Sequence, residues 1–311
     1  MKLRLGTRGS LLARTQSGHV AKRLEAHGHV VEPVIIETAG DRDLTSPFGE
    51  IGTFGVFVRE IERQLEDGTI DVAVHSYKDV PTKGPATLVI AAVPERRDPA
   101  DVVVARPEAM RSEPLDLVGL VSGARVGTSS ARRRAQLSSL RGDLVSVAMR
   151  GNVPTRLRKV RDGACDATLL AAAGLERLQE SGAGAPDLEG LVIRRLAPDR
   201  FVPAPAQGAL AVQVRRDRAD VVAAVRALDD PRLAAAIRAE RALLARVEGG
   251  CDLPFGAWAE PVAGSIRLVA GLEVDGVFRF VELRGDDPDA LAGSAWAELG
   301  ADPQAARRGT S

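Results

Sequence analysis

The stretch Ile70-Asp71-Val72-Ala73-Val74-His75-Ser76-Tyr77-Lys78-Asp79-Val80-Pro81 joins an apolar run to a charged pair. Its first five residues are apolar with one exception, which is typical of a strand buried in a parallel sheet. Pro81 stops regular structure, so Lys78 and Asp79 are expected just past the carboxyl end of that strand. Ligands bind at this edge of open α/β sheets, and a carboxylate there can serve acid-base chemistry. A solvated turn with a local ion pair would have the same sequence.

Strands and helices alternate around this stretch. The pattern predicts strands at 3–5, 31–38 and 70–74, with helices at 10–26 and 56–65. Such alternation is typical of a parallel or mixed sheet covered by helices, so the predicted fold class is α/β.

Two short segments recur in the second part of the chain. Arg4-Leu5-Gly6-Thr7 is matched by Arg125-Val126-Gly127-Thr128, each between a short strand and a helix. Asp67-Gly68-Thr69-Ile70-Asp71-Val72 is matched by Asp162-Gly163-Ala164-Cys165-Asp166-Ala167, each between a helix and a buried strand. The repeat predicts two similar α/β domains, although matches this short can also arise by chance. In this alignment Cys165 is expected to be a small buried apolar residue.

A chain of 311 residues is long enough for two or three domains. A charged segment at 95–100 marks one boundary, and the alternating run 209–214 is expected to be a strand that returns to the first domain. The predicted domains are 1–97 with 204–226, then 98–203, then 227–311. The last is a small α+β domain, because a helix at 234–247 precedes two strands joined by Asp275-Gly276, a hairpin signal.

Composition excludes several classes of protein. The 42 basic and 42 acidic residues give a net charge of zero, and seven Phe, two Trp and one Tyr offer few rings for base stacking, so no nucleic-acid partner is expected. No Cys/His cluster has zinc spacing, and no metal is expected. The sequence shows no signal peptide and no membrane-spanning run. The cytoplasm is therefore the expected location. Nothing in the sequence suggests a large exposed apolar face, so a monomer is expected.

Arginines gather at the beginnings of three predicted helices, where the helix dipole disfavours cations. Arg8 precedes the capping residue Ser10, Arg132-Arg133-Arg134 follow Thr128-Ser129-Ser130, and Arg150 and Arg156 flank Pro154. Free helix N–H groups, hydroxyls and guanidinium together favour an anion. Arginine suits carboxylates, and phosphate is the competing ligand, although no Walker-type loop is present. Solvent-facing arginines are the alternative.

The second cysteine, Cys251, ends Glu248-Gly249-Gly250-Cys251 just after a predicted helix. A helix C-terminus does not lower a thiol pKa, so a fast nucleophile is not indicated. The position is compatible with a one-time covalent attachment as well as with a structural role.

Six motifs, in this order and spacing, resemble the porphobilinogen deaminase (hydroxymethylbilane synthase) family over nearly the whole chain. They are Gly6-Thr7-Arg8-Gly9-Ser10, His75 to Pro81, Gly127-Thr128-Ser129-Ser130-Ala131-Arg132-Arg133, Arg150-Gly151-Asn152-Val153-Pro154-Thr155-Arg156, Ala206-Gln207-Gly208-Ala209 and Glu248-Gly249-Gly250-Cys251. The resemblance implies two similar domains built like those of periplasmic binding proteins, followed by a small α+β domain. It also implies a transferase that joins four porphobilinogen molecules, with loss of ammonia, and releases 1-hydroxymethylbilane.

The resemblance implies a dipyrromethane cofactor attached to Cys251 through a thioether, and it gives Asp79 the catalytic role. Implied cofactor contacts are Cys251, Lys78, Asp79, Thr128, Ser129, Arg132, Arg133 and Arg150. Implied substrate contacts are Arg8, Ser10, Gln16, Arg150, Arg156, Arg177 and Gln207, with Phe57 near the pyrrole rings. Because each pyrrole carries an acetate and a propionate, the growing chain is a polyanion, which accounts for the surplus of arginine.

One departure from the family concerns a lysine that many members carry in Gly-Lys-Gly-Leu-Phe. Phe54 occupies that place here, so no role of the lysine is carried over. The polar loop 41–52 before it is compatible with a mobile lid. Two other readings stay open: a non-catalytic two-lobed anion-binding protein that uses the same arginines, and a nucleic-acid binder that uses Arg132 to Arg134.

Overall fold

The computed structural model describes residues 1–36, 56–111, 116–181, 188–247 and 254–300. The chain divides into two compact units, 1–97 with 180–184 and 208–234, and 98–179 with 185–207 and 235–311. The three domain boundaries expected from the sequence stay a prediction.

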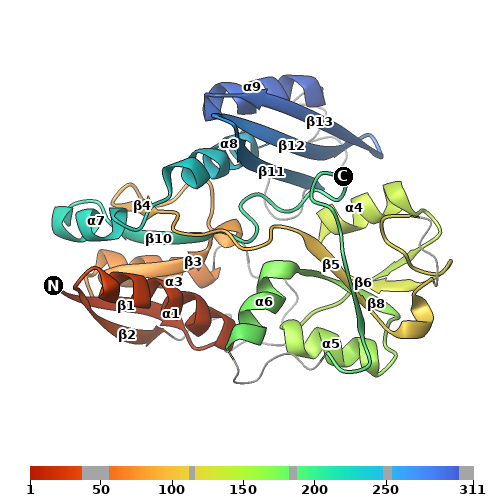
Figure 1. Ribbon diagram of the computed structural model, residues 1–311, viewed down its shortest axis with the longest axis horizontal. Coiled ribbons are helices and arrows are strands. Elements are labelled where there is room, and N and C mark those ends of the chain that lie inside the picture. Colours follow the sequence, from red (N-terminus) through yellow and green to blue (C-terminus); the bar gives the residue numbers. More distant parts are fainter. Residues whose placement is uncertain (37–55, 112–115, 182–187, 248–253, 301–311) are drawn as a thin grey trace. The chain divides into compact units, whose positions relative to one another are not determined.

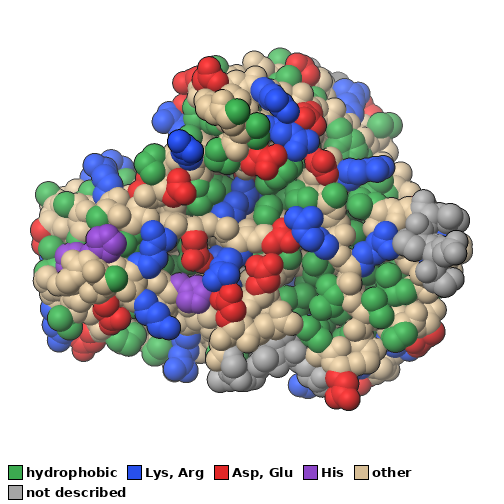
Figure 2. Space-filling model, viewed as in Figure 1, with side chains coloured by type: hydrophobic (Ala, Val, Ile, Leu, Met, Phe, Trp, Pro, Cys, Tyr) green, Lys and Arg blue, Asp and Glu red, His purple; other side chains and the backbone are tan. Residues whose placement is uncertain are grey.

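On the face drawn in Figure 2, basic and acidic side chains are interspersed, in keeping with the net charge of zero.

The first unit contains a five-stranded sheet with the order β2-β1-β3-β10-β4 (Figure 1). Its strands are β1 (Lys2–Arg8), β2 (Val30–Ile36), β3 (Val72–Ser76), β4 (Leu88–Ala92) and β10 (Leu210–Arg215). β1 is parallel to β2 and β3, whereas β10 is antiparallel to β3 and β4. The expected strand at 209–214 therefore does return to the first sheet.

Helices cover both faces of this sheet. They are α1 (Leu11–Ala26), α3 (Val56–Glu66) and α7 (Ala219–Arg226). Leu24 of α1 and Val225 of α7 share one buried cluster, while Leu65 of α3 belongs to a cluster on the other face. Side chains alternate along each strand, so one strand such as β3 supplies Val72 and Ala73 to opposite clusters.

The second unit contains a sheet of the same design, with the order β7-β6-β8-β5-β9. Its strands are β5 (Asp101–Ala105), β6 (Arg125–Gly127), β7 (Val145–Val147), β8 (Ala167–Ala171) and β9 (Val192–Arg195). Again two pairs are parallel and β5 is antiparallel to its neighbours. Its helices are α4 (Ala131–Leu140), α5 (Val153–Arg161) and α6 (Ala172–Glu180). The prediction of two similar α/β sheets is confirmed.

The repeat extends to individual contacts. Asp71 accepts hydrogen bonds from the backbone and side chain of Arg4, at 2.9 and 3.0 Å, and Asp166 does the same for Arg125, at 2.7 and 3.4 Å. A β-carbon at Gly6 would overlap the Ile70 side chain, and one at Gly127 would lie 3.1 Å from Cys165 Sγ.

Cys165 thus takes the place of Ile70, as the sequence predicted. It is fully buried, and this burial raises the pKa of its thiol. Cys165 is therefore a structural residue.

The second unit also holds a three-stranded antiparallel sheet of β11 (Phe255–Val262), β12 (Ser265–Val274) and β13 (Val277–Gly285). It packs against α8 (Pro231–Val247) and α9 (Pro288–Leu299) through Leu243, Leu268 and Leu291. Asp275 and Gly276 have φ values of 52° and 77°, as the expected hairpin turn requires. The expected helix at 234–247 and the two strands of the hairpin are confirmed, whereas β11 was not predicted from the sequence.

Candidate active site

The carboxyl ends of β1 and β3 lie at the same edge of the first sheet because the two strands are parallel. At this edge β3 continues into a 3₁₀ turn, η1 (Tyr77–Asp79). The Tyr77 amide donates to Ala209 O at 3.0 Å and the Val80 amide donates to Tyr77 O at 3.2 Å, so the turn is held at both ends. Within it Lys78 is half-buried and Asp79 is exposed. The expected position of this pair is confirmed.

The predicted contacts Arg8, Ser10 and Gln16 are brought to the same edge. Arg8 is the last residue of β1, and Ser10 caps α1 by accepting a hydrogen bond from the Ala13 amide at 3.3 Å. Gln16 is buried and donates to Ser76 Oγ at 2.8 Å. This bond ties α1 to the end of β3, directly before the turn that carries Asp79.

A buried polar chain lies behind this edge, and the sequence analysis missed it. Gln213 of β10 donates through Nε2 to Glu62 Oε1 at 3.0 Å, so its oxygen faces His75 Nε2, 2.9 Å away. Burial lowers the pKa of His75 to about 4, although the bond to Gln213 opposes the shift. A neutral His75 that donates from Nε2 is the state consistent with these contacts.

The second unit places its candidate residues at the corresponding edge of its own sheet. The Thr128 hydroxyl accepts from the Ser130 amide at 3.2 Å. The Ser129 hydroxyl donates to Met149 O at 2.9 Å and accepts from the Met149 amide at 3.1 Å. The hydroxyls of Thr128 and Ser129 therefore stabilise the loops that follow β6 and β7.

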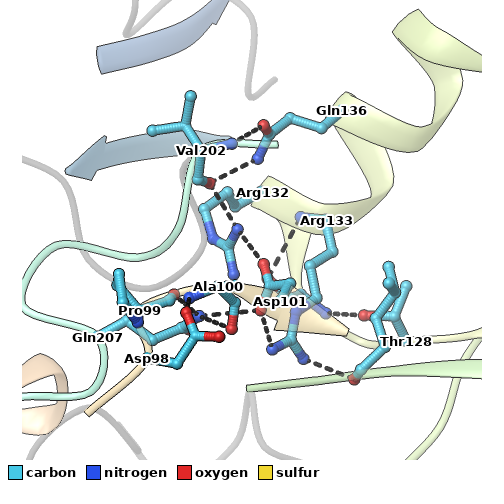
Figure 3. A network of polar contacts seen from close by, with 12 residues as sticks. Asp98, Pro99, Ala100, Asp101, Thr128, Arg132, Arg133, Gln136, Val202 and Gln207 are labelled. Carbon is cyan, nitrogen blue, oxygen red and sulfur yellow. Dashed lines mark hydrogen bonds and ion pairs between the residues drawn. The ribbon is translucent and has the colours of Figure 1, made fainter. Parts of the chain in front are cut away.

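Arg132 and Arg133, in the first turn of α4, are buried and share one carboxylate (Figure 3). Arg132 donates to Asp101 Oδ2 and Arg133 to Asp101 Oδ1, both at 2.7 Å. Each also donates to a backbone carbonyl, Val202 O at 2.7 Å and Leu169 O at 2.8 Å. The alternative of solvent-facing arginines is wrong for these two, whereas Arg134 is exposed.

Gln207 joins the same network through its amide nitrogen, which lies 2.7 Å from Pro99 O and 3.0 Å from Asp101 Oδ1. The preceding residue, Ala206, has φ of +60°, which is rare for a residue other than glycine. Glu240 of α8 stabilises this turn, because its carboxylate accepts from the amides of Ala206 at 2.5 Å and Ala259 at 2.6 Å. A buried acid of the α+β part thus holds the segment that orients Gln207.

The remaining predicted arginines differ in exposure. Arg150 is exposed, Arg156 is half-buried with Nε donating to Gly151 O at 2.8 Å, and Arg177 is buried. Burial, together with the positive charge of Arg133, lowers the pKa of Arg156 to about 10. The guanidinium groups of Arg156 and Arg133 are therefore close enough to repel each other.

Some predicted features lie outside the described residues: Cys251, Phe54 and the loop 41–52. Phe57 is placed by its backbone in the first turn of α3. Across the part of the chain that the structure describes, no group of three or more His, Cys, Asp or Glu side chains could hold a metal ion. A search of the same residues finds no helix with the length and apolarity to cross a membrane.

Comparison with known proteins assigns the chain. Residues 3–223 match the model of the porphobilinogen deaminase dipyromethane cofactor binding domain, and residues 234–292 match that of the porphobilinogen deaminase C-terminal domain. The chain belongs to the porphobilinogen deaminase family. Porphobilinogen deaminase from Nocardia farcinica is 45% identical over 284 residues, covering 91% of this chain and 75% of that protein. The Roseiflexus enzyme of the same name is 46% identical, covering 86% and 84%.

Solved structures of lower similarity include the periplasmic VFT2 domain of Bordetella pertussis BvgS and the periplasmic aliphatic sulphonate binding protein SsuA from Escherichia coli. They are 15% identical to this chain, with TM-scores of 0.41 and 0.40. The first match covers 73% of this chain and 86% of that domain, and the second covers 79% and 70%.

The arginine cluster fits the cofactor of a porphobilinogen deaminase. Arg132, Arg133 and Arg156 bring three positive charges, while Asp101 is the carboxylate that pairs with the first two. Burial alone would raise the pKa of Asp101, but the two guanidinium groups outweigh it and keep the pKa below its usual range. The region thus keeps an excess of buried positive charge that the carboxylates of a dipyrromethane would neutralise.

In the second unit of this porphobilinogen deaminase, Asp101 and Gln136 are two candidate site residues that sequence reasoning missed. Gln136 brackets Val202, accepting from its amide at 2.6 Å and donating to its carbonyl at 2.9 Å. The sequence feature that could have indicated Asp101 is its place as a lone acid directly before the apolar run 102–105. Ligand contacts were expected after strands and at the ends of helices, not before a strand, but β5 runs antiparallel and so brings its first residue to the same edge.

Proposed function

We propose that this protein joins four porphobilinogen molecules head to tail on a bound dipyrromethane, with release of one ammonia for each, and that water then releases 1-hydroxymethylbilane. The observation that carries the proposal is the excess of guanidinium charge from the buried Arg132 and Arg133 and the half-buried Arg156, because the substrate and product are polycarboxylates. Dipyrromethane supplies the first two pyrrole rings of the chain.

We assign Asp79 to the chemical step. When ammonia leaves porphobilinogen, the remaining pyrrole carries positive charge, and a nearby carboxylate stabilises it and accepts hydrogen bonds from ring N–H groups. Asp79 is exposed on a turn whose ends are held by backbone hydrogen bonds, so it is both accessible and fixed. Lys78 in the same turn is assigned to a cofactor contact.

The carboxylate contacts fall to the edges of the two sheets. Arg8, Ser10 and Gln16 of the first unit are assigned to substrate, as are Arg156, Arg177 and Gln207 of the second. Thr128, Ser129, Arg132, Arg133 and Arg150 are assigned to the cofactor, with Arg150 also reaching substrate. The bidentate geometry of guanidinium suits the acetate and propionate groups of each ring.

We assign the covalent attachment of the cofactor to Cys251. Cys165 does not suit this role, because it is fully buried and burial raises the pKa of its thiol. We further propose that the protein acts as a monomer in the cytoplasm and that the three sheets mark three domains. Gel filtration of the purified protein tests the first point.

The deciding experiment is intact mass spectrometry with peptide mapping of the wild type and of matched Cys251→Ser and Cys165→Ser variants. The wild type and Cys165→Ser should carry the mass of two linked pyrroles on the Cys251 peptide, and Cys251→Ser should not. Turnover of porphobilinogen to 1-hydroxymethylbilane should follow the same pattern. A wild-type chain that stays unmodified after incubation with porphobilinogen, yet binds it, would contradict the proposal and favour an anion-binding protein.

A further inference from the structure

Asp101 differs from the other acids of the second sheet in how completely it is enclosed. It is the first residue of β5 and has no exposed surface. Each of its two oxygens takes a different guanidinium at 2.7 Å, and Gln207 Nε2 adds a third contact at 3.0 Å (Figure 3). A carboxylate that accepts from three side chains in a dry environment has a fixed orientation.

The same contacts restrict how the two arginines can turn. Arg132 uses Nη1 for both Asp101 and Val202 O, while Arg133 uses Nη2 for Asp101 and Nη1 for Leu169 O. Val202 is itself held by Gln136. For Arg133 the carbonyl and Asp101 hold two different nitrogens, whereas for Arg132 they both accept from one nitrogen.

Charge explains why this acid matters to a ligand site. Two guanidinium groups at this depth repel each other, because the interior screens charge far less than water does. The carboxylate between them reduces the charge of the trio to a single positive charge. Without it, the arginines would turn apart or recruit an anion from solution into the place of the carboxylate.

We propose that Asp101 is a positioning residue that holds Arg132 and Arg133 side by side, ready for the carboxylates of cofactor and substrate, by acting as a built-in carboxylate between them. The proposal rests on the proposed function of these arginines as carboxylate contacts. It assigns Asp101 no direct contact with the ligand.

The first sheet shows that the fold itself does not require an acid here. Pairing of β5 with β8 sets Asp101 opposite Ala171, and pairing of β10 with β3 sets Leu210 opposite Ser76. Because the two sheets share one strand order, Leu210 occupies the position of Asp101, and it is fully buried. An apolar residue therefore satisfies the packing, and the carboxylate is explained by the arginines.

Chemical rescue of Asp101→Ala tests the proposal. Removal of the carboxylate leaves a gap between two guanidinium groups, and formate fits this gap because it carries two carboxylate oxygens. Chloride at equal ionic strength is the control anion, because it has no oxygens to accept from both arginines. Asp166→Ala is the matched control, because Asp166 also pairs with two arginines, Arg106 at 2.7 Å and Arg125 at 3.3 Å, outside the proposed site. Formate should raise the melting temperature of Asp101→Ala, and leave that of Asp166→Ala and the wild type unchanged.

Two further readouts separate positioning from stability alone. Asp101→Ala should raise the KM for porphobilinogen by about tenfold and lower the fraction of chains that carry dipyrromethane, and formate should reverse both. Asp166→Ala should lose stability without a change in KM. Equal behaviour of the two variants, or a lack of formate rescue, would overturn the inference.

A second variant covers the case in which Asp101→Ala does not fold. Asp101→Asn keeps the size of the side chain and removes its charge, so the KM for porphobilinogen should still rise, and an unchanged KM would overturn the proposal. If the wild type binds no porphobilinogen at all, the proposed function fails. The melting experiment with formate then still decides whether a carboxylate is required between the two arginines.

Discussion

The first and second five-stranded sheets have one strand order and one pattern of parallel and antiparallel pairs, yet they carry different chemistry at the same edge. In the first sheet, β3 ends in the exposed turn Tyr77–Asp79. By register the matching residues after β8 are 172–174, Ala-Ala-Gly, which begin α6. The second sheet instead brings buried arginines around Asp101. One scaffold thus supplies an exposed acid on one sheet and a pair of buried guanidinium groups on the other.

The two sheets share the residues that hold their strands together. The Arg4–Asp71 and Arg125–Asp166 pairs join the same two strands, and Gly6 and Gly127 allow the same close approach of side chains. What differs lies at strand ends and helix beginnings, where a change of side chain leaves the core intact. The comparison predicts that edge substitutions change activity, with a loss of stability where the edge residue is buried, and that substitutions of shared residues change stability.

The largest effect is expected at the edge of the first sheet. Asp79→Asn should lower kcat for porphobilinogen by about three orders of magnitude, because it removes the charge that stabilises the cationic pyrrole. The melting temperature should not change, since Asp79 is exposed. Asp162→Asn, at an exposed acid of the second unit, should leave kcat unaltered. Full turnover by Asp79→Asn would show that the first sheet does not supply the acid.

At the corresponding edge of the second sheet, Asp101→Leu would introduce the residue that β10 carries at the same position. The free energy of unfolding should fall by about 3–5 kcal/mol, because two buried guanidinium groups lose their carboxylate. Urea denaturation measures the change. The reverse exchange, Leu210→Asp, should also destabilise strongly, since no arginine pair is expected to receive the acid. A neutral result for Asp101→Leu would mean that the arginines find other partners.

The shared glycines should respond unequally to a β-carbon. Gly6→Ala would press against Ile70 and Ile36, whereas Gly127→Ala would meet the flexible end of Met149 as well as Cys165. Overpacking of this kind costs about 1–3 kcal/mol, and we expect Gly6→Ala to lie at the upper end, because β-branched isoleucine adjusts less than methionine. Thermal unfolding of the two variants makes the comparison. A larger loss of stability for Gly127→Ala than for Gly6→Ala would show that the side chains around Gly6 adjust more easily than those around Gly127.

The smallest effect near neutral pH is a pH dependence of stability. It concerns the first sheet alone, because Leu170 occupies the place of His75 in the second sheet. With its pKa lowered to about 4 in the folded protein, His75 stays neutral while the unfolded chain takes up a proton below pH 6.5. Stability should therefore fall by about 1.4 kcal/mol per pH unit as the pH drops from 6.5 towards 4.

His75→Gln is the variant that isolates this contribution. Unfolding in urea at pH 7 and at pH 5.5 should show a smaller pH dependence for the variant than for the wild type, whatever its stability at pH 7. An equal pH dependence in both proteins would mean that His75 is not the titrating group.

Much of this protein could be predicted from its sequence. The repeat, the α/β class, the hairpin at Asp275-Gly276 and the place of Asp79 all follow from local patterns, since apolar periodicity and turn residues act over a few neighbours. The motif order predicted the family, which the comparisons confirm.

Tertiary structure alone decided which groups meet. Arg132 and Arg133 stand next to each other in the sequence, but Asp101 is thirty-one and thirty-two positions away from them, and His75, Gln213 and Glu62 come from three separate elements. Nothing local indicates that β5 enters its sheet antiparallel, or that a lone acid before an apolar run lies at the same edge as the residues that follow β8. The physical reason is that a buried charge needs a partner, and its partner is chosen by the fold rather than by the neighbouring residues.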